Sequence, residues 1–205
     1  MSHAPYDLIA DEWIRERHPF REKQYVDQFL PLTIPGAHLL DVGCGAATPI
    51  TRYLLDRGYH VTGVDSSAAM LRLARTNCPE AEFVAGDMVT IELAGGYHGI
   101  VAWDSIFHVP KAQHGQLFHT LYRWLAPDTP LLLSLGGSEG EFLAPMFGID
   151  FFYSAHSPAV SLALLQEAGF AIMLAEIDDP SSRGHLVVLC KKPAHSLLSS
   201  ARAHQ

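Results

Sequence analysis

The sequence predicts an α/β protein built on a doubly wound, mostly parallel sheet of seven strands, with an antiparallel hairpin at its C-terminal end. From residue 37 onward, short apolar segments alternate with segments of helical period, which is typical of strands joined by crossover helices. The segment 99–104, GIVAWD, is apolar almost throughout, as expected of a strand buried on both faces. Too few residues join 171–177 to 184–190 for a crossover helix, so these two strands are expected to pair antiparallel at the sheet edge.

The expected helices and strands follow in order. Residues 5–30 are predicted to be helical, with a break at Pro19 and an end marked by Pro31 and Pro35. Strand patterns then occur at 38–42, 59–65, 81–87, 99–104, 130–136, 171–177 and 184–190. Helical periods between them predict helices at 48–58, 66–78, 111–125 and 157–170.

One domain is expected over residues 1–205, because no repeat, low-complexity segment or linker divides the chain. A chain of this length with 48% hydrophobic residues suits one sizeable core. Within the domain we expect an N-terminal helical lid at 1–35, a core at 37–192 and a C-terminal tail at 193–205. The long connection 136–157 is expected to act as a second lid.

Composition excludes several classes of function. The chain has 14 basic and 22 acidic residues, a net charge of −8, so tight binding to a phosphate backbone is not expected. No stretch of 18 apolar residues occurs, and the N-terminus lacks a signal-peptide pattern, so neither a membrane span nor export is expected. Cys44, Cys78 and Cys190 lie far apart, which favours a cytoplasmic protein without disulfides. The sequence carries no signal for an oligomeric state.

The end of the first predicted strand suggests a nucleotide-type ligand. Asp41 is followed by Gly43 and Gly45, but Thr48 stands where a dinucleotide-binding loop has its third glycine. A carboxylate at Asp41 would repel a pyrophosphate and would suit an ammonium or sulfonium group. Asp65 ends the next strand, where a carboxylate can accept two hydrogen bonds from a ribose. The pattern therefore predicts a nucleoside ligand that is cationic elsewhere and has no pyrophosphate.

Four segments carry a family resemblance. LLDVGCGAATPI, VTGVDSSAAML, AEFVAGDM and GIVAWDSIFHV resemble, in order and spacing, the successive motifs of class I S-adenosylmethionine-dependent methyltransferases, which have a Rossmann-like fold. The resemblance runs from about Ala37 to Cys190. WIRERHPFREK and FFYSAHSPAVSLALLQEAGF are also similar to a subgroup of small bacterial methyltransferases. The resemblance implies S-adenosylmethionine as the cofactor and a small molecule as the methyl acceptor.

The resemblance also implies a cofactor site. Gly43 and Gly45 would let the backbone approach the methionine part, and Asp41 would lie near its amino end. Asp65 would bind the ribose, and Asp87 would bind the adenine amino group. The full implied set, in which Cys44 acts through its amide, is Asp41, Gly43, Cys44, Gly45, Asp65, Ser66, Met70, Asp87, Met88, Trp103 and Asp104.

The resemblance places methyl transfer after the fourth strand, in WDSIFHV. His108 is the first candidate for a general base and Asp104 the second, although His108 could instead orient the acceptor. A base is needed for a hydroxyl acceptor but not for a thiolate or a free amine. No Asn/Asp-Pro-Pro-Tyr motif follows the strand, which argues against amino methylation of nucleobases or glutamine. The 12 histidines show no metal-ligand spacing, so no metal is expected.

Aromatic residues in and beside the two predicted lids are expected to exclude water and to shape the acceptor pocket. They are Tyr6, Trp13, Phe20, Phe107, Phe147, Phe152 and Tyr153. The sequence thus predicts methyl transfer, by in-line displacement, to an oxygen, nitrogen or sulfur nucleophile of a small molecule. The alternative is a non-catalytic module of the same fold that holds the cofactor or a partner protein.

Overall fold

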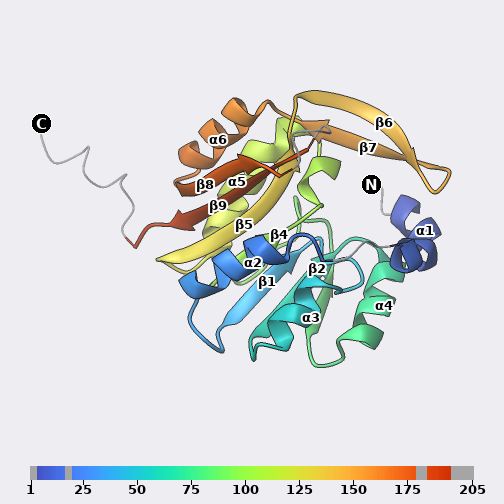
Figure 1. Cartoon of the computed structure of the whole chain (residues 1–205), viewed down its shortest axis with the longest axis horizontal. Coiled ribbons are helices and arrows are strands. Elements are labelled where there is room, and N and C mark those ends of the chain that lie inside the picture. The colour runs from blue at the N-terminus through green and yellow to red at the C-terminus, as the bar shows by residue number, and fades with distance from the viewer. Residues whose placement is uncertain (1–3, 17–19, 179–183, 195–205) are drawn as a thin grey trace, which may run out of the picture.

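The computed structural model describes residues 4–16, 20–178 and 184–194 (Figure 1). The predicted break at Pro19 and the predicted tail from residue 195 onward lie outside the described residues. Across the described ranges, no helix is both long and apolar enough to cross a membrane.

Seven strands form one sheet in the order β3-β2-β1-β4-β5-β9-β8. In chain order they are β1 (His38–Val42), β2 (His60–Asp65), β3 (Glu82–Ala85), β4 (Ile100–Ala102), β5 (Thr129–Gly136), β8 (Ala171–Ile177) and β9 (His185–Lys192). The first five run parallel, whereas β9 pairs antiparallel with both β5 and β8. The predicted fold class is confirmed, including the antiparallel pair at the sheet edge.

Helices cover both faces of this sheet (Figure 1). The helices α2 (Lys23–Phe29) and α3 (Ile50–Leu55) bury their apolar side chains in one cluster, and α5 (His114–Trp124) and α6 (Pro158–Glu167) bury theirs in the other. Side chains along β4 alternate between the two clusters, so that this strand is buried on both faces. This two-sided burial is what the apolar segment at 99–104 predicts.

The connection 136–157 differs most from expectation. It forms an antiparallel hairpin of β6 (Gly140–Met146) and β7 (Ile149–Ala155), separate from the main sheet. Its two-residue turn, Phe147-Gly148, has φ angles of 51° and 78°, the pattern of a type I′ hairpin turn. Such turns usually carry Asn-Gly, and Pro145 within β6 argues against a strand. For these two reasons the sequence pattern did not predict the hairpin.

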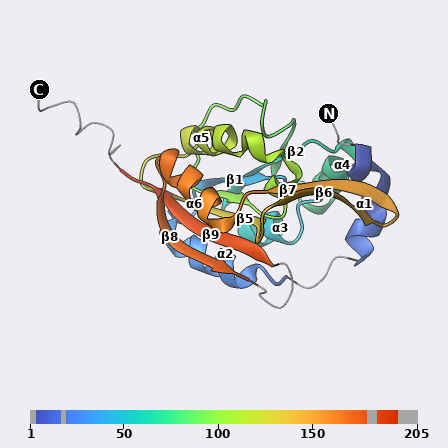
Figure 2. The same cartoon turned by 90° about the horizontal axis from the view of Figure 1, so that it is seen from above.

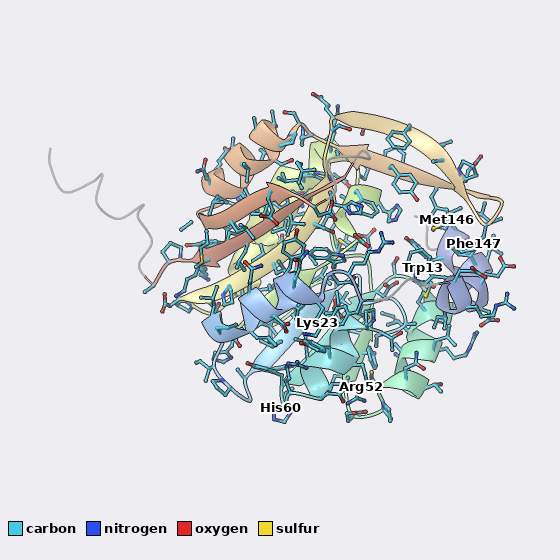
Figure 3. The ribbon with its side chains drawn as sticks, in the orientation of Figure 1. Trp13, Lys23, Arg52, His60, Met146 and Phe147 are labelled. Atoms are coloured by element: carbon cyan, nitrogen blue, oxygen red, sulfur yellow. The ribbon has the colours of Figure 1, made fainter. Side chains whose placement is uncertain are left out.

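Four of the remaining elements contribute to the carboxyl ends of the strands: α1 (Ala4–Glu16), the start of α4 (Ala68–Asn77) and the 3-10 helices η2 (Ile106–His108) and η3 (Lys111–Gln113). The 3-10 helix η1 (Leu30–Leu32) directly precedes β1 and lies at the opposite end of the sheet. Helix α1 packs against both α4 and β7, and both views show them side by side (Figures 1 and 2). Figure 3 shows Trp13 of α1 on the same side of the molecule as Met146 and Phe147 of the hairpin. The two segments predicted as lids therefore lie next to each other.

Candidate active site

A cavity of about 590 Å³ opens at the carboxyl ends of β1, β2, β3 and β4. The order of the sheet reverses between β1 and β4, the place where open α/β sheets bind ligands. The strand ends, α1, η2 and β7 all contribute to its wall. Predicted site residues that line it are Tyr6, Trp13, Gly43, Gly45, Asp65, Ser66, Met70, Asp87, Met88, Trp103, Asp104, His108 and Phe152.

The two glycines after β1 are needed for different reasons. A Cβ atom on Gly43 would lie 2.2 Å from the Cβ of Ser105, whose hydroxyl donates to the carbonyl of Val42 at 2.9 Å. Gly43 is therefore needed for close packing against the chain after β4. Gly45 has a φ of +53°, and no atom lies within 4 Å of where its Cβ would be. Gly45 thus presents bare backbone to the cavity, as close approach of a ligand requires.

Asp65 links the glycine loop to the start of α4. One carboxylate oxygen, Oδ2, accepts from the amide of Gly45 at 2.8 Å, and the other, Oδ1, accepts from the amide of Ser67 at 2.8 Å. Burial raises the pKa of the Asp65 carboxyl, and these amides act in the opposite direction. Asp65 therefore has a structural role in addition to its place in the cavity wall.

Asp41 and Cys44 lie behind the loop. The described residues that line the cavity include neither. Asp41 is 3% exposed, and its Oδ2 accepts from the hydroxyl of Thr51 in α3 at 2.6 Å. The Cys44 sulfur packs over Gly63 of β2, and burial raises the pKa of its thiol. The Asp41 carboxylate is thus placed to hold the loop against α3.

The turns after β2 and β3 carry the other residues that were predicted to bind the nucleoside part of the cofactor. The Ser67 hydroxyl caps α4 by accepting from the amide of Met70 at 3.1 Å. The Met70 side chain is buried and reaches the cavity from the first turn of α4. Asp87 is exposed, and its Oδ1 accepts from the amide of Val89 at 2.8 Å, which orders the turn that also carries Met88.

Asp104, at the end of β4, has a left-handed backbone. Its φ is 49°, which is uncommon outside glycine. The hydroxyl of Ser134 accepts from the Asp104 amide at 2.8 Å and donates to its Oδ1 at 3.1 Å. Two bonds to one serine thus hold Asp104 in a conformation that costs energy, at a position on the cavity wall.

His108 has defined partners on both ring nitrogens. Its Nδ1 lies 2.8 Å from the carbonyl oxygen of Phe152, which can only accept, so Nδ1 carries the proton of the neutral ring. Its Nε2 lies 2.8 Å from the hydroxyl of Tyr6 and therefore accepts from it. Burial lowers the pKa of His108, and the bond to Phe152 acts in the opposite direction. A neutral His108 thus has its one basic lone pair directed at Tyr6.

The predicted aromatic pocket is brought together only in part. Tyr6, Trp13 and Phe152 line the cavity, whereas the described lining residues do not include Phe20, Phe107, Phe147 or Tyr153. Phe20 packs on Tyr53, with ring centroids 4.9 Å apart, and Phe147 at the hairpin tip is 41% exposed. Phe107 stacks on Tyr153 at 5.7 Å, and both rings lie against His108.

Two residues that the sequence analysis missed shape the site. Phe151 lines the cavity and packs on Tyr6 at 4.8 Å, which becomes apparent only once β7 is known to be a strand beside α1. Asp7 on α1 accepts from the Ser67 hydroxyl at 2.6 Å, and no sequence pattern indicates that contact.

Residues 39–128 match a model of the Methyltransferase domain family. A trans-aconitate 2-methyltransferase from Paracidovorax citrulli is 39% identical over 140 residues, covering 67% of this chain and 51% of that protein. A ubiquinone biosynthesis O-methyltransferase from Alkalilimnicola ehrlichii is 28% identical over 164 residues, covering 72% and 64%. The chain thus spans about half to two thirds of the length of these curated relatives.

Solved structures share the fold. A structure of a SAM-dependent methyltransferase from Methanosarcina mazei has a TM-score of 0.71 at 22% identity and covers 83% of this chain and 98% of its own. A DhpI–SAH complex has a TM-score of 0.75 at 18% identity, with 94% and 96% covered. The family match, the relatives and the shared fold agree: residues 39–128 match a methyltransferase domain, and the chain has the fold of S-adenosylmethionine-dependent methyltransferases.

Proposed function

We propose that this chain transfers a methyl group from S-adenosylmethionine to an oxygen, nitrogen or sulfur nucleophile of a small molecule. One observation carries the proposal: a single cavity of about 590 Å³ is lined both by the Asp65 turn with Gly45 and by the Tyr6–His108 pair. Its volume is in the usual range for small-molecule sites. The names of relatives, which include trans-aconitate and ubiquinone-biosynthesis methyltransferases, support a small acceptor.

The part of the cavity lined by Gly45, Asp65 and Asp87, called the nucleoside side, suits this cofactor. Each oxygen of Asp65 accepts one backbone amide and has a further lone pair, which can take a ribose hydroxyl. Gly45 leaves room for the methionine part, and the carboxylates of Asp87 and Asp104 complement a cationic ligand. When bound, S-adenosylmethionine supplies a methyl group activated by the sulfonium. The chain supplies position, electrostatics and exclusion of water.

The part of the cavity lined by Tyr6, His108, Phe151 and Phe152, called the acceptor side, can hold and move a proton. Since Nε2 of His108 already accepts from Tyr6, a proton leaving an acceptor hydroxyl would pass to the Tyr6 oxygen as the proton of Tyr6 passes to His108. The Phe152 carbonyl stays bonded to Nδ1 and favours the charged ring that forms. His108 is thus the proposed general base, with Tyr6 as the link to it. A thiolate or free amine acceptor would use the same pair for orientation alone.

Aromatic rings would keep this side dry. Tyr6 packs edge-on against Trp13 at 6.1 Å and against Phe151 at 4.8 Å. These rings and Phe152 form the part of the wall that α1 and β7 contribute. In such an environment, charges in the transition state interact more strongly than in water.

The first test is a calorimetric titration with S-adenosylhomocysteine and, separately, with NAD. We expect saturable binding of S-adenosylhomocysteine and none of NAD; binding of NAD without any response to S-adenosylhomocysteine would overturn the proposal.

The second test incubates the protein with S-adenosylmethionine and phenol, catechol, amine, thiol and carboxylic acid acceptors. Formation of S-adenosylhomocysteine with one acceptor class would identify the nucleophile. Cofactor binding without turnover on any of them would favour the non-catalytic alternative.

A further inference from the structure

Two consecutive residues of α1 contact two different parts of the site. The Tyr6 hydroxyl donates to Nε2 of His108 at 2.8 Å. The Asp7 carboxylate, through Oδ1, accepts from the hydroxyl of Ser67 at 2.6 Å and from the amide of Ala69 at 3.0 Å, both at the start of α4. Because successive side chains diverge by about 100° around a helix, one turn of α1 can reach both elements.

Helix α4 already has its own cap. The Ser67 hydroxyl accepts from the amide of Met70 at 3.1 Å, and the Ser67 amide donates to Asp65. Asp7 binds this same serine from outside, so its contact is not required to start the helix. What the contact adds is a fixed link between α1 and the turn that carries Asp65.

The apolar contacts of α1 do not fix its orientation, so polar contacts must set it. Ala10 packs with Ala46 and Met70, and Tyr6 and Trp13 pack against this cluster. Such contacts attract a helix without fixing its rotation. Asp7, bonded to Ser67 and Ala69, therefore adds a directional contact between α1 and α4 next to the Tyr6 hydroxyl.

We infer that Asp7 is a positioning residue that couples cofactor binding at the Asp65 turn to the placement of Tyr6 against His108. The inference rests on the proposed place of the cofactor. A ligand on Asp65 orders residues 65–67, and Asp7 transmits that order to α1 through Ser67. By linkage, the docked position of α1 strengthens cofactor binding by the same free energy by which the bound cofactor stabilises that position.

Three variants test the inference: Asp7→Ala, Asp7→Asn and, as a matched control, Asp11→Ala. Asn keeps the acceptor oxygen for Ser67 and Ala69, while Asp11 is an exposed carboxylate one turn further along the same helix. The Kd of S-adenosylhomocysteine should rise about tenfold in Asp7→Ala, because charge-assisted hydrogen bonds are lost. Asp7→Asn and Asp11→Ala should both stay within about threefold of wild type.

Hydrogen exchange of residues 4–16 provides the second measurement. S-adenosylhomocysteine should slow exchange of this segment in wild type, Asp7→Asn and Asp11→Ala, but not in Asp7→Ala. Unchanged Kd and unchanged protection in Asp7→Ala would overturn the inference. So would a lower Tm with an unchanged Kd, which indicates a purely structural cap.

A double-mutant cycle with Tyr6→Phe separates this inference from the proposed function. Tyr6→Phe should lower turnover by a larger factor than it raises the Kd of S-adenosylhomocysteine, because the ring that packs on Trp13 and Phe151 is kept. If Asp7 acts by placing Tyr6, the loss of turnover in the double variant should be smaller than the product of the two single losses. Independent losses would contradict the coupling. If wild type does not bind S-adenosylhomocysteine, the proposed function itself fails.

Discussion

The nucleoside side and the acceptor side of the cavity are built from contacts of different range. On the nucleoside side, the Gly45 amide and Asp65 are 20 positions apart and lie at the ends of adjacent parallel strands. On the acceptor side, Tyr6 and His108 are 102 positions apart, and His108 and Phe152 are 44 apart. The first side follows from the order of the sheet, whereas the second depends on how α1 and the hairpin dock.

Burial acts on both sides but in opposite directions. It raises the pKa of the Asp65 carboxyl and lowers the pKa of His108, because in each case it disfavours the charged form. Backbone amides oppose the shift at Asp65, and the Phe152 carbonyl opposes it at His108. At both groups burial outweighs the opposing hydrogen bonds, so the pKa of each is displaced in the direction that favours its neutral form.

The largest expected effect is on the nucleoside side. Asp65→Ala removes the acceptor for two proposed ribose hydroxyls and for the amides of Gly45 and Ser67. We expect the Kd of S-adenosylhomocysteine to rise by about 10²-fold or more. The Tm should also fall, since two backbone amides lose their acceptor.

Asp56→Ala is the matched control for calorimetry and a thermal scan, because its exposed carboxylate pairs with Arg52 and is not among the described residues that line the cavity. An Asp65→Ala variant that binds as well as Asp56→Ala would remove Asp65 from the cofactor site.

The next effect concerns the acceptor side. His108→Gln should lower turnover by about 10²-fold for a hydroxyl acceptor and change the Kd of S-adenosylhomocysteine less than threefold. Steady-state kinetics together with calorimetry measure the two separately. His119→Gln, at an exposed position of α5, controls for the substitution itself. Full turnover in His108→Gln would end the proposal of a base and leave proximity as the main source of rate.

A third expectation follows from the lowered pKa of His108. Its neutral form persists below the ordinary value of about 6.5, so kcat/KM for a hydroxyl acceptor should stay level at that pH and fall only as pH drops through the lowered pKa. A pH–rate profile measures the acid limb, which should vanish in His108→Gln. An acid limb at or above about 6.5 would contradict a buried base.

The smallest effect lies at the hairpin tip. Phe147 has a φ of 51° and is 41% exposed, so Phe147→Asn relieves backbone strain and completes an Asn-Gly turn. The gain in stability should be up to about 1 kcal/mol, seen as a slightly higher Tm. Turnover should not change. A loss of turnover would mean that Phe147 belongs to the acceptor pocket after all.

The same contrast explains how far the sequence could predict the molecule. Periodic apolar segments predicted all seven strands of the sheet, and the strand ends predicted the cavity position of Gly45, Asp65 and Asp87. Asp41 was predicted beside the ligand, but its side chain turns toward Thr51, because alternation along a strand cannot tell which polar contact a buried carboxylate makes.

The acceptor side was predicted less well. Because Phe-Gly is an unusual hairpin turn, the hairpin was not predicted. Phe151 was therefore missed, and the exposed Phe147 was included in the predicted acceptor pocket. The contact of Asp7 with Ser67 joins positions 60 apart, and no local pattern could indicate it.

The most direct test of the central claim is a crystal structure of the protein with bound S-adenosylhomocysteine. We predict the ribose hydroxyls on Asp65, the methionine part along Gly45, and the sulfur facing the Tyr6–His108 pair across the cavity. Such a pose would join the two sides in one reaction. A ligand bound elsewhere, or one whose sulfur faces away from His108, would contradict the account.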